Sequence, residues 1–334
     1  MTIELNNDSQ KSPNTLHAWG IAVLLVVTLI WGTSYPFLKG AVSSLSPSAI
    51  LATRFAVAAL PFTPYLRFLN LPLLRDGVFL GLIIFSTLTL QTVGLETTSA
   101  NRAAFIASFN VILVPLLGQL LGRQVFLKTF LTAGIALIGV GVMCWESGEI
   151  VIGDLLMLGN AFLYSIYILK LESITLRHPI LPLTAIQLWV ITIVSLIWAA
   201  PDLLRQHEAI TANLGVLLYL GLFDTAATIV LQIVAQRWVN AYETALMYTL
   251  EPIFGAVFSF LLLGEKLGVR GVIGATLVLV AMIFGQSKSQ ETEDYGEIQV
   301  NEPIVAALSA ADTEPINVPV SLLNPNLMES KLDS

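Results

Sequence analysis

The sequence predicts an all-α integral membrane protein with ten transmembrane helices. Of its 334 residues, 55% are hydrophobic and 12% are charged, whereas a soluble domain carries about 25% charged residues. Apolar runs of about 17–25 residues, the length that a helix needs to cross a bilayer, recur along the chain with short connections between them. No extramembrane domain is therefore expected between the spans.

The expected spans are bounded by short polar connections. They cover residues 18–38, 48–69, 77–95, 101–122, 129–146, 152–171, 181–200, 212–235, 242–263 and 269–286. Residues 1–17 are polar and lack a cleavable signal pattern, so the first apolar run should be a retained helix. Residues 287–334 are acidic and contain several prolines, which is typical of a disordered tail. The net charge of −7 resides in this tail and says nothing about a substrate.

The distribution of lysine and arginine predicts the orientation. If the N-terminus is inside, ten of these residues fall on the cytoplasmic side and six on the other side. Basic residues accumulate in cytoplasmic loops. We therefore expect a multi-pass protein of the cell membrane with both termini in the cytoplasm.

An internal repeat is visible when the fourth and ninth spans are aligned. Residues 103–124 then lie beside residues 245–266, so that Gly122 matches Gly264 and Asn110 matches Pro252. Each half has five spans, and because five is odd the second half must enter the membrane from the opposite side. Inverted repeats of this kind are common in secondary transporters. The predicted organisation is a segment 1–17, a five-helix repeat 18–146, a second repeat 152–286 and a tail 287–334.

The ninth span carries a charge and a helix breaker at one place, Glu251-Pro252. A charge at the centre of a bilayer costs on the order of 2.5–3.5 kcal/mol on insertion scales. Proline removes a backbone donor and loosens the helix one turn back, near Tyr248. We therefore expect a water-lined interior surface close to this position.

Four segments in this order resemble the EamA family of the drug/metabolite transporter superfamily. They are WGTSYPFLK in the first span, TRFAVAALPF in the second, LGNAFLYSIYIL in the sixth and LEPIFGAVFSFLLLGEKL in the ninth. The resemblance covers about residues 18–286 and implies a metabolite permease with a central cavity between two five-helix halves. The first half departs from the motif, with Asn110 and Arg123-Gln124 where the second half has Pro252 and Glu265-Lys266. The paired basic residues with which relatives bind phosphate-bearing substrates are not evident, which disfavours nucleotide sugars.

Polar residues at helical spacing predict which faces line the cavity. Positions three or four apart share a helix face, as Asp224, Thr228 and Gln232 do in the eighth span. The expected cavity residues are Trp31, Tyr35, Gln91, Asn160, Tyr164, Tyr167, Asp224, Thr228, Gln232 and Tyr248. The alternative for each is a hydrogen bond across helices, worth about 0.6 kcal/mol.

The charges in the spans carry more weight, because ionisable groups in a membrane face an interior or a cavity. We expect Asp224 to take part in substrate or proton chemistry. Glu251 and Pro252 are assigned to gating or to holding the broken helix. Lys39, Arg54 and Glu265 are assigned structural roles. Whether a cation pairs with Asp224 is left open, since Lys39 and Arg54 lie toward the outer side.

These observations predict a secondary transporter that moves a small metabolite, such as an amino acid or a related amphipathic compound, by alternating access. We expect an exporter and no enzymatic activity. An intramembrane enzyme is the alternative, but Asp224 is the one deep aspartate and the three histidines lie outside the spans. A channel or sensor on the same bundle is a further alternative. No cofactor, metal or nucleic-acid partner is expected; proton coupling and a monomer or weak homodimer remain open.

Overall fold

A computed structural model describes residues 13–144, 149–263 and 268–286. Within these ranges the regular structure is helical, and no strand occurs. The first helices are α1 (Pro13–Gly32), α2 (Ser34–Ala41), α3 (Pro47–Ala59), α4 (Leu71–Thr97), α5 (Ala100–Ala107), α6 (Asn110–Leu120) and α7 (Leu127–Cys144). They are followed by α8 (Ile152–Thr175), α9 (Ile180–Arg205), α10 (His207–Ala212), α11 (Leu214–Gly221), α12 (Thr228–Ala235), α13 (Ala241–Tyr248), α14 (Glu251–Leu263) and α15 (Val269–Gln286). A 3-10 helix, Leu60–Phe68, continues α3, and a π-helical segment, Leu222–Ala227, joins α11 to α12.

Several of these helices are long and apolar enough to cross a membrane. Seven such stretches occur in the described chain: Asn14–Ala41, Pro47–Phe68, Leu71–Thr97, Ala100–Leu120, Ile152–Thr175, Ile180–Arg205 and Leu214–Ala235. Two shorter apolar helices are Leu127–Val142 and Val269–Gly285. The chain is therefore a multi-pass membrane protein, while the count of ten spans stays a prediction. The expected tail 287–334, the first twelve residues and Glu265 lie outside the described residues.

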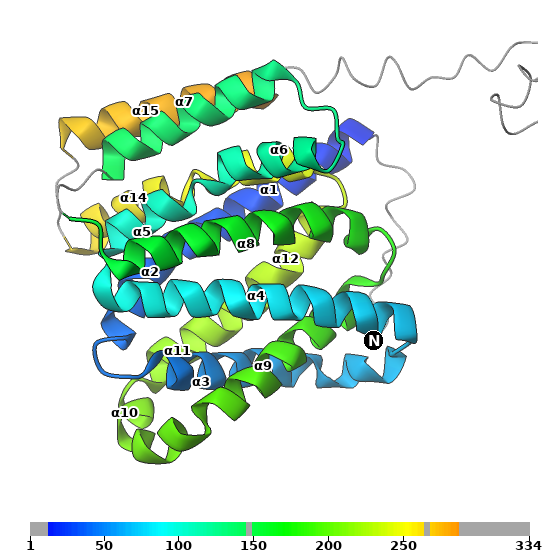
Figure 1. Cartoon of the computed structure of the whole chain (residues 1–334), viewed down its shortest axis with the longest axis vertical. Coiled ribbons are helices and arrows are strands. Elements are labelled where there is room, and N and C mark those ends of the chain that lie inside the picture. Colours follow the sequence, from blue (N-terminus) through cyan, green and yellow to red (C-terminus); the bar gives the residue numbers. More distant parts are fainter. Residues whose placement is uncertain (1–12, 145–148, 264–267, 287–334) are drawn as a thin grey trace, which may run out of the picture. The chain divides into compact units, whose positions relative to one another are not determined.

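The helices of the described bundle pack in neighbouring pairs (Figure 1). Helices α7 and α15 lie side by side, α4 runs along α8, and α3 packs against α9. Helix α1 contacts both α12 and α14. Many large apolar side chains face outward, such as Ile197 with 73% of its surface exposed. Such an apolar exterior suits lipid rather than water.

Buried apolar side chains form separate clusters on the two flanks of α8. One cluster joins α1, α7, α13 and α15 and includes Leu24, Val140 and Met247. Another joins α3, α4, α8 and α9 and includes Phe55. Tyr164 of α8 packs against both clusters. Tyr164 therefore lies where these two apolar clusters meet.

Short turns interrupt the stretches α1–α2, α5–α6 and α13–α14, and a proline follows the first and the last of these breaks. Helix α13 ends at Tyr248 and α14 begins at Glu251, which confirms the break predicted from Pro252. Helix α1 ends at Gly32 and α2 begins at Ser34, with Pro36 in the first turn of α2. Proline is tolerated in a first turn because that N–H has no helical partner. Each proline therefore begins a new helix without a lost hydrogen bond.

The break after α1 packs directly on the start of α14. A Cβ added to Gly32 would lie 2.6 Å from the Phe254 Cβ and 2.9 Å from the Gly255 nitrogen. A methyl group does not fit in that space. Glycine at position 32 thus allows the two interrupted helices to meet at their breaks.

Candidate functional site

A cavity lies among the interrupted helices and α8. The space between atoms here is about 760 Å³, a figure that includes open solvent. The polar and aromatic residues of its lining are Trp31, Ser34, Tyr35, Arg54, Thr87, Gln91, Asn110, Asn160, Tyr164, Asp224, Thr225, Thr228, Gln232 and Glu251. The apolar lining consists of Leu38, Ile84, Leu88, Ala107 and Ile229.

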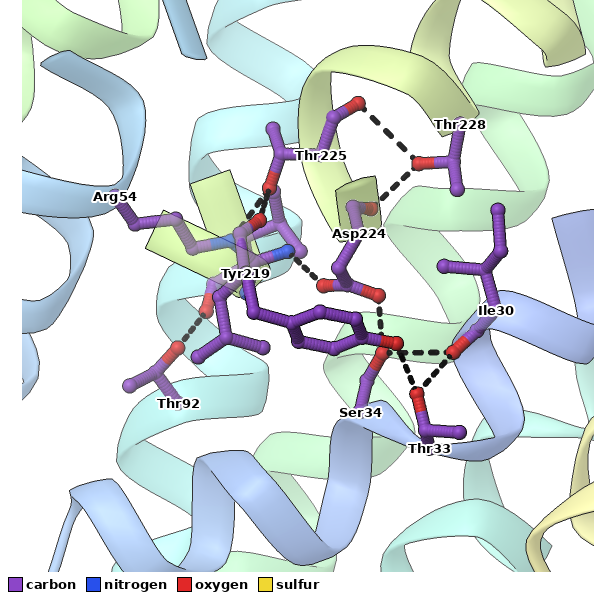
Figure 2. Close-up of polar contacts among 11 residues, drawn as sticks. Ile30, Thr33, Ser34, Arg54, Thr92, Tyr219, Asp224, Thr225 and Thr228 are labelled. Carbon is purple, nitrogen blue, oxygen red and sulfur yellow. Dashed lines mark hydrogen bonds and ion pairs between the residues drawn. The ribbon is translucent and has the colours of Figure 1, made fainter. Parts of the chain in front are cut away.

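The π-helical segment places Asp224 on this cavity. Within the segment, the Thr225 Oγ1 donates to the Leu220 carbonyl oxygen at 2.7 Å, five residues earlier. The Thr228 Oγ1 donates to the Asp224 carbonyl oxygen at 2.5 Å (Figure 2). Single-turn π segments are rare and occur frequently at functional sites. The wider turn lies between α11 and α12, and Asp224 within it lines the cavity together with Thr228 and Gln232 of α12.

Asp224 forms a buried ion pair with Arg54 of α3. The Arg54 Nη2 lies 2.5 Å from the Asp224 Oδ2, and the Arg54 Nε donates to the Thr225 Oγ1 at 2.5 Å (Figure 2). The Ser34 hydroxyl donates to the Asp224 Oδ1. Both charged residues are almost fully buried, with 4% and 3% of their surfaces exposed. Removing one partner of such a pair costs about 3–5 kcal/mol, because the other charge is left uncompensated.

A close backbone contact brings the ion pair together. A Cβ on Gly221 would lie 2.7 Å from the Arg54 carbonyl oxygen and 3.0 Å from a Val57 methyl group. Only glycine lets α11 approach α3 this closely. Two features of the sequence therefore position Asp224: Gly221, three residues earlier, and the π turn that contains Asp224.

A second polar contact ties the break after α1 to α11. The Thr33 and Tyr219 hydroxyl groups hydrogen-bond to each other, and the Thr33 Oγ1 donates to the Ile30 carbonyl oxygen at 2.7 Å (Figure 2). Ser34 and Thr33 thus connect the first interrupted helix to the segment that carries Asp224. A change at Asp224 would reach the start of α2 through one hydrogen bond.

The lining on α8 and its neighbours is polar but uncharged. The Asn160 Nδ2 donates to the Thr87 carbonyl oxygen at 2.9 Å, and the Tyr164 hydroxyl donates to the Gln232 Oε1 at 3.2 Å. The Asn110 Oδ1 and the Gln232 Nε2 are buried and have no hydrogen-bond partner in the structure. The cavity therefore combines the Arg54–Asp224 pair and the Glu251 carboxyl group with neutral polar groups.

Aromatic side chains form a cluster beside the cavity. The Trp31 ring centroid lies 4.9 Å from that of Tyr248 and 6.0 Å from that of Tyr164. Tyr164 stacks on Tyr167 at 5.6 Å. Of these four residues, Trp31 and Tyr164 line the cavity. They offer flat apolar surface close to the charged pair.

The predicted site residues separate into those on the cavity and those behind it. Trp31, Tyr35, Gln91, Asn160, Tyr164, Asp224, Thr228, Gln232 and Glu251 line it. Tyr167 does not, since it is fully buried and donates its hydroxyl to the Gln187 Oε1 at 2.9 Å. Tyr248 and Pro252 are buried and lie outside the lining. The three residues form the packing behind the cavity wall.

The charges assigned structural roles have different surroundings. The Lys39 Nζ donates to the carbonyl oxygens of Leu95 and Thr98, at 2.5 and 2.9 Å, at the C-terminal end of α4. Lysine there satisfies carbonyls that the helix leaves unpaired. Arg54 lines the cavity beside Asp224, so the pairing that the sequence left open is present.

The polar lining residues that were not among the expected site residues number four: Ser34, Thr87, Asn110 and Thr225. Ser34 and Thr225 are each adjacent in sequence to a selected residue, Tyr35 and Asp224, and the π turn brings Thr225 onto the cavity. Asn110 matches Pro252 in the aligned repeat and is the first residue of α6. Alignment of the two breaks could have identified Asn110 as a residue equivalent to the Glu251-Pro252 pair.

Comparison with known proteins agrees with the motifs. The model of the EamA-like transporter family matches residues 18–145 and 151–284. An uncharacterized transporter of Archaeoglobus fulgidus is 33% identical over 266 residues, which cover 78% of this chain and 83% of its own. One of Methanothermobacter thermautotrophicus is 26% identical and covers 84% of this chain and 90% of its own.

A solved crystal structure shares the fold. It is 13% identical and superposes with a TM-score of 0.65 over 83% of this chain and 99% of its own. The relatives are named as transporters, which are not enzymes. The family expected from the ninth-span motif is confirmed: the chain belongs to the EamA-like transporter family.

Proposed function

We propose that this membrane transporter is a secondary carrier that exports a small amphipathic metabolite, such as an amino acid, by alternating access. The observation that carries the proposal is the buried Arg54–Asp224 ion pair on the wall of the cavity. A guanidinium and a carboxylate are the complements of a substrate carboxylate and a substrate ammonium group. Trp31 and Tyr164 supply apolar surface for the rest of such a molecule.

The arrangement of neighbouring helices supports two inverted halves, residues 18–146 and 152–286, with ten spans in total. When the halves are exchanged, several neighbouring pairs become other neighbouring pairs or remain the same pair. The contact of α4 with α8 corresponds to that of α12 with α1, and the contact of α6 with α8 corresponds to that of α14 with α1. The pairs α3–α9 and α7–α15 correspond to themselves. Rocking between such halves is a common basis of alternating access.

The break at Glu251-Pro252 is our candidate for the moving part. Glu251 is the first residue of α14 and lines the cavity, and α14 packs on α1 at its own break. Two interrupted helices that meet can bend with little loss of backbone hydrogen bonds. The Glu251→Gln substitution is expected to lower the transport rate more than the substrate affinity.

The lysine and arginine distribution supports both termini in the cytoplasm and insertion in the cell membrane. The sequence has no ATP-binding loop of the GxxxxGK[ST] kind, and we propose a transporter driven by gradients. Protonation of Asp224 or Glu251 in the cavity is the proposed route if protons are coupled. The working unit is proposed to be a monomer or a weak homodimer.

The experiment begins with metabolite profiles of cells that lack or overproduce the protein, which select candidate substrates. Purified protein in liposomes loaded with an unlabelled candidate is then assayed for uptake of the labelled compound. A carrier gives counterflow that saturates with substrate concentration. Uptake that stays linear and shows no counterflow would replace the carrier with a channel.

Three variants assign the uptake to the ion pair. Asp224→Asn should reduce uptake at least about tenfold, the effect of removing one charge-assisted hydrogen bond. The double variant Arg54→Met with Asp224→Leu should give more folded protein than either single change, because no charge remains unpaired. It should not transport the substrate. The control is Asp202→Asn, a carboxylate that also accepts from serine hydroxyls (Ser46 and Ser48) but does not line the cavity. Full uptake by Asp224→Asn would remove the ion pair from the site.

A further inference from the structure

The cavity has an unpaired donor and an unpaired acceptor in its neutral part. The Gln232 Nε2 and the Asn110 Oδ1 are buried and have no hydrogen-bond partner among the residues that the structure describes. The residues are 1% and 5% exposed, and both line the cavity. A buried polar atom without a partner costs free energy, so a hydrogen bond from a bound molecule to either atom would be favourable.

The two atoms come from different parts of the fold. Gln232 lies on α12, and Asn110 is the first residue of α6, the helix that begins after a break. Helix α8 packs against both α6 and α12 and contributes Asn160 and Tyr164 to the lining. A group held by both atoms would therefore bridge two helices that belong to different halves of the chain.

Neighbouring contacts fix what each atom offers. The Tyr164 hydroxyl donates to the Gln232 Oε1 at 3.2 Å, which leaves the Nε2 as the free donor. The Asn110 oxygen can only accept. One free donor and one free acceptor match a neutral group that has both functions. A carboxamide meets this requirement, with a carbonyl oxygen for Gln232 and an N–H for Asn110.

We propose that Asn110 and Gln232 form a subsite for a neutral carboxamide on the substrate. This inference rests on the proposed function: Arg54 and Asp224 hold the charged end of a zwitterion, and the subsite selects its side chain. The chemical class is an amino acid with an amide side chain. Glu251 also lines the cavity, so a substrate with a side-chain ammonium group is the competing class in the test.

The test compares glutamine, its apolar counterpart norleucine, and lysine in liposomes with the purified full-length protein. Glutamine should be taken up with an apparent affinity at least about tenfold higher than norleucine, which leaves the buried donor and acceptor unpaired. Gln232→Met and Asn110→Leu should each remove the preference for glutamine over norleucine. Thermal stabilisation of the detergent-solubilised protein by each amino acid gives a second readout that does not depend on transport.

A matched control is available one helical turn further along. Gln236 is a buried glutamine with one unpartnered oxygen, and it does not line the cavity. Gln236→Met should reproduce any loss of folded protein seen with Gln232→Met and keep the preference for glutamine. Loss of preference in Gln236→Met would assign the effect to packing and overturn the subsite.

The outcomes separate the two proposals. If none of the three amino acids is transported or stabilises the protein, the proposed amino-acid function fails. If glutamine and norleucine are carried equally, the two atoms serve hydration only, and the subsite is wrong while the carrier stands. Lysine carried in preference to glutamine would overturn the subsite in favour of Glu251.

Discussion

Two of the interrupted helices, α5–α6 and α13–α14, share their geometry and differ in their chemistry. Helices α5 and α13 each have 8 residues before the break. Each begins with a capped N-terminus: the Ser99 Oγ accepts from the Arg102 nitrogen at 3.1 Å, and the Asn240 Oδ1 accepts from the Glu243 nitrogen at 2.9 Å. The residue three places after the cap is thus an arginine in one helix and a glutamate in the other.

These two residues make contacts in equivalent places with opposite charge. Arg102 pairs with Asp154 in the first turn of α8, and the Glu243 Oε2 lies 3.0 Å from the His17 Nε2 near the start of α1. An arginine presents five N–H donors in a fixed fork, whereas a histidine ring presents one or two. The fold therefore determines where each of these interrupted helices is anchored, and the side chains determine how strong the anchoring contact is.

The breaks themselves differ in the same way. Helix α14 starts with Glu251-Pro252, while α6 starts with Asn110 and has its proline, Pro115, further along. Both first residues line the cavity. One break therefore presents a carboxyl group and the other an amide. Proline helps to end the helix at one break, but the other break forms without it.

The largest loss of stability in this comparison is expected when the Arg102–Asp154 pair is broken. Arg102→Met leaves Asp154 without its cation, although the Thr98 hydroxyl and the Val151 nitrogen still donate to it. We expect the free energy of unfolding to fall by about 2–4 kcal/mol. This is toward the lower end of the cost for buried ion pairs, because Arg102 is partly exposed. His17→Gln removes the corresponding pair at the other end and should cost at most about 1 kcal/mol, since His17 is one-third exposed. The measurement is the denaturation midpoint in detergent, and equal losses would contradict the difference in anchoring.

A smaller effect is expected where the breaks of α1 and α13–α14 meet. Gly32→Ala places a methyl group 2.9 Å from the Gly255 nitrogen, an overpacking that costs about 1–3 kcal/mol. Gly40→Ala is the control, because a Cβ there meets nothing within 4 Å. The yield of monodisperse protein and the thermal midpoint should fall for Gly32→Ala alone. Similar behaviour of the two variants would show that the breaks do not need this contact.

The smallest effect on stability is expected for Pro252→Ala, which tests whether the break in α13–α14 depends on its proline. Since α6 begins without a proline at the matching place, Pro252→Ala should keep the break and change the stability by less than about 1 kcal/mol. It should instead lower the transport rate, because alanine restores a backbone N–H donor that can form hydrogen bonds resisting movement at the break. Unchanged counterflow in Pro252→Ala would contradict a gating role for this proline.

The helical segments and much of the cavity lining could be predicted from the sequence. Apolar length located the helices, and the spacing of Asp224, Thr228 and Gln232 placed three residues on one wall. Pro252 predicted one break. These features follow from local chemistry, which a sequence displays directly.

The rest depends on how helices rotate against each other. The pairing of Arg54 with Asp224 requires Gly221 to lie against α3 and a π turn to form, and neither follows from helical periodicity. By helical spacing, Tyr167 shares a polar face with Asn160 and Tyr164, yet its hydroxyl donates to Gln187 of α9. Such choices are made by tertiary packing, so spacing alone assigned Tyr167 to the cavity.

The central claim is that this cavity opens to each side of the membrane in turn and closes around its substrate. The direct measurement uses Ala107→Cys, a lining position, in a protein whose only cysteine is first removed by Cys144→Ala. Its labelling by a membrane-impermeant maleimide is measured from each side of sealed vesicles of known orientation. We predict labelling from both sides, in proportions that substrate gradients shift, and protection by saturating substrate. Labelling from one side only, unaffected by substrate, would contradict alternating access through this cavity.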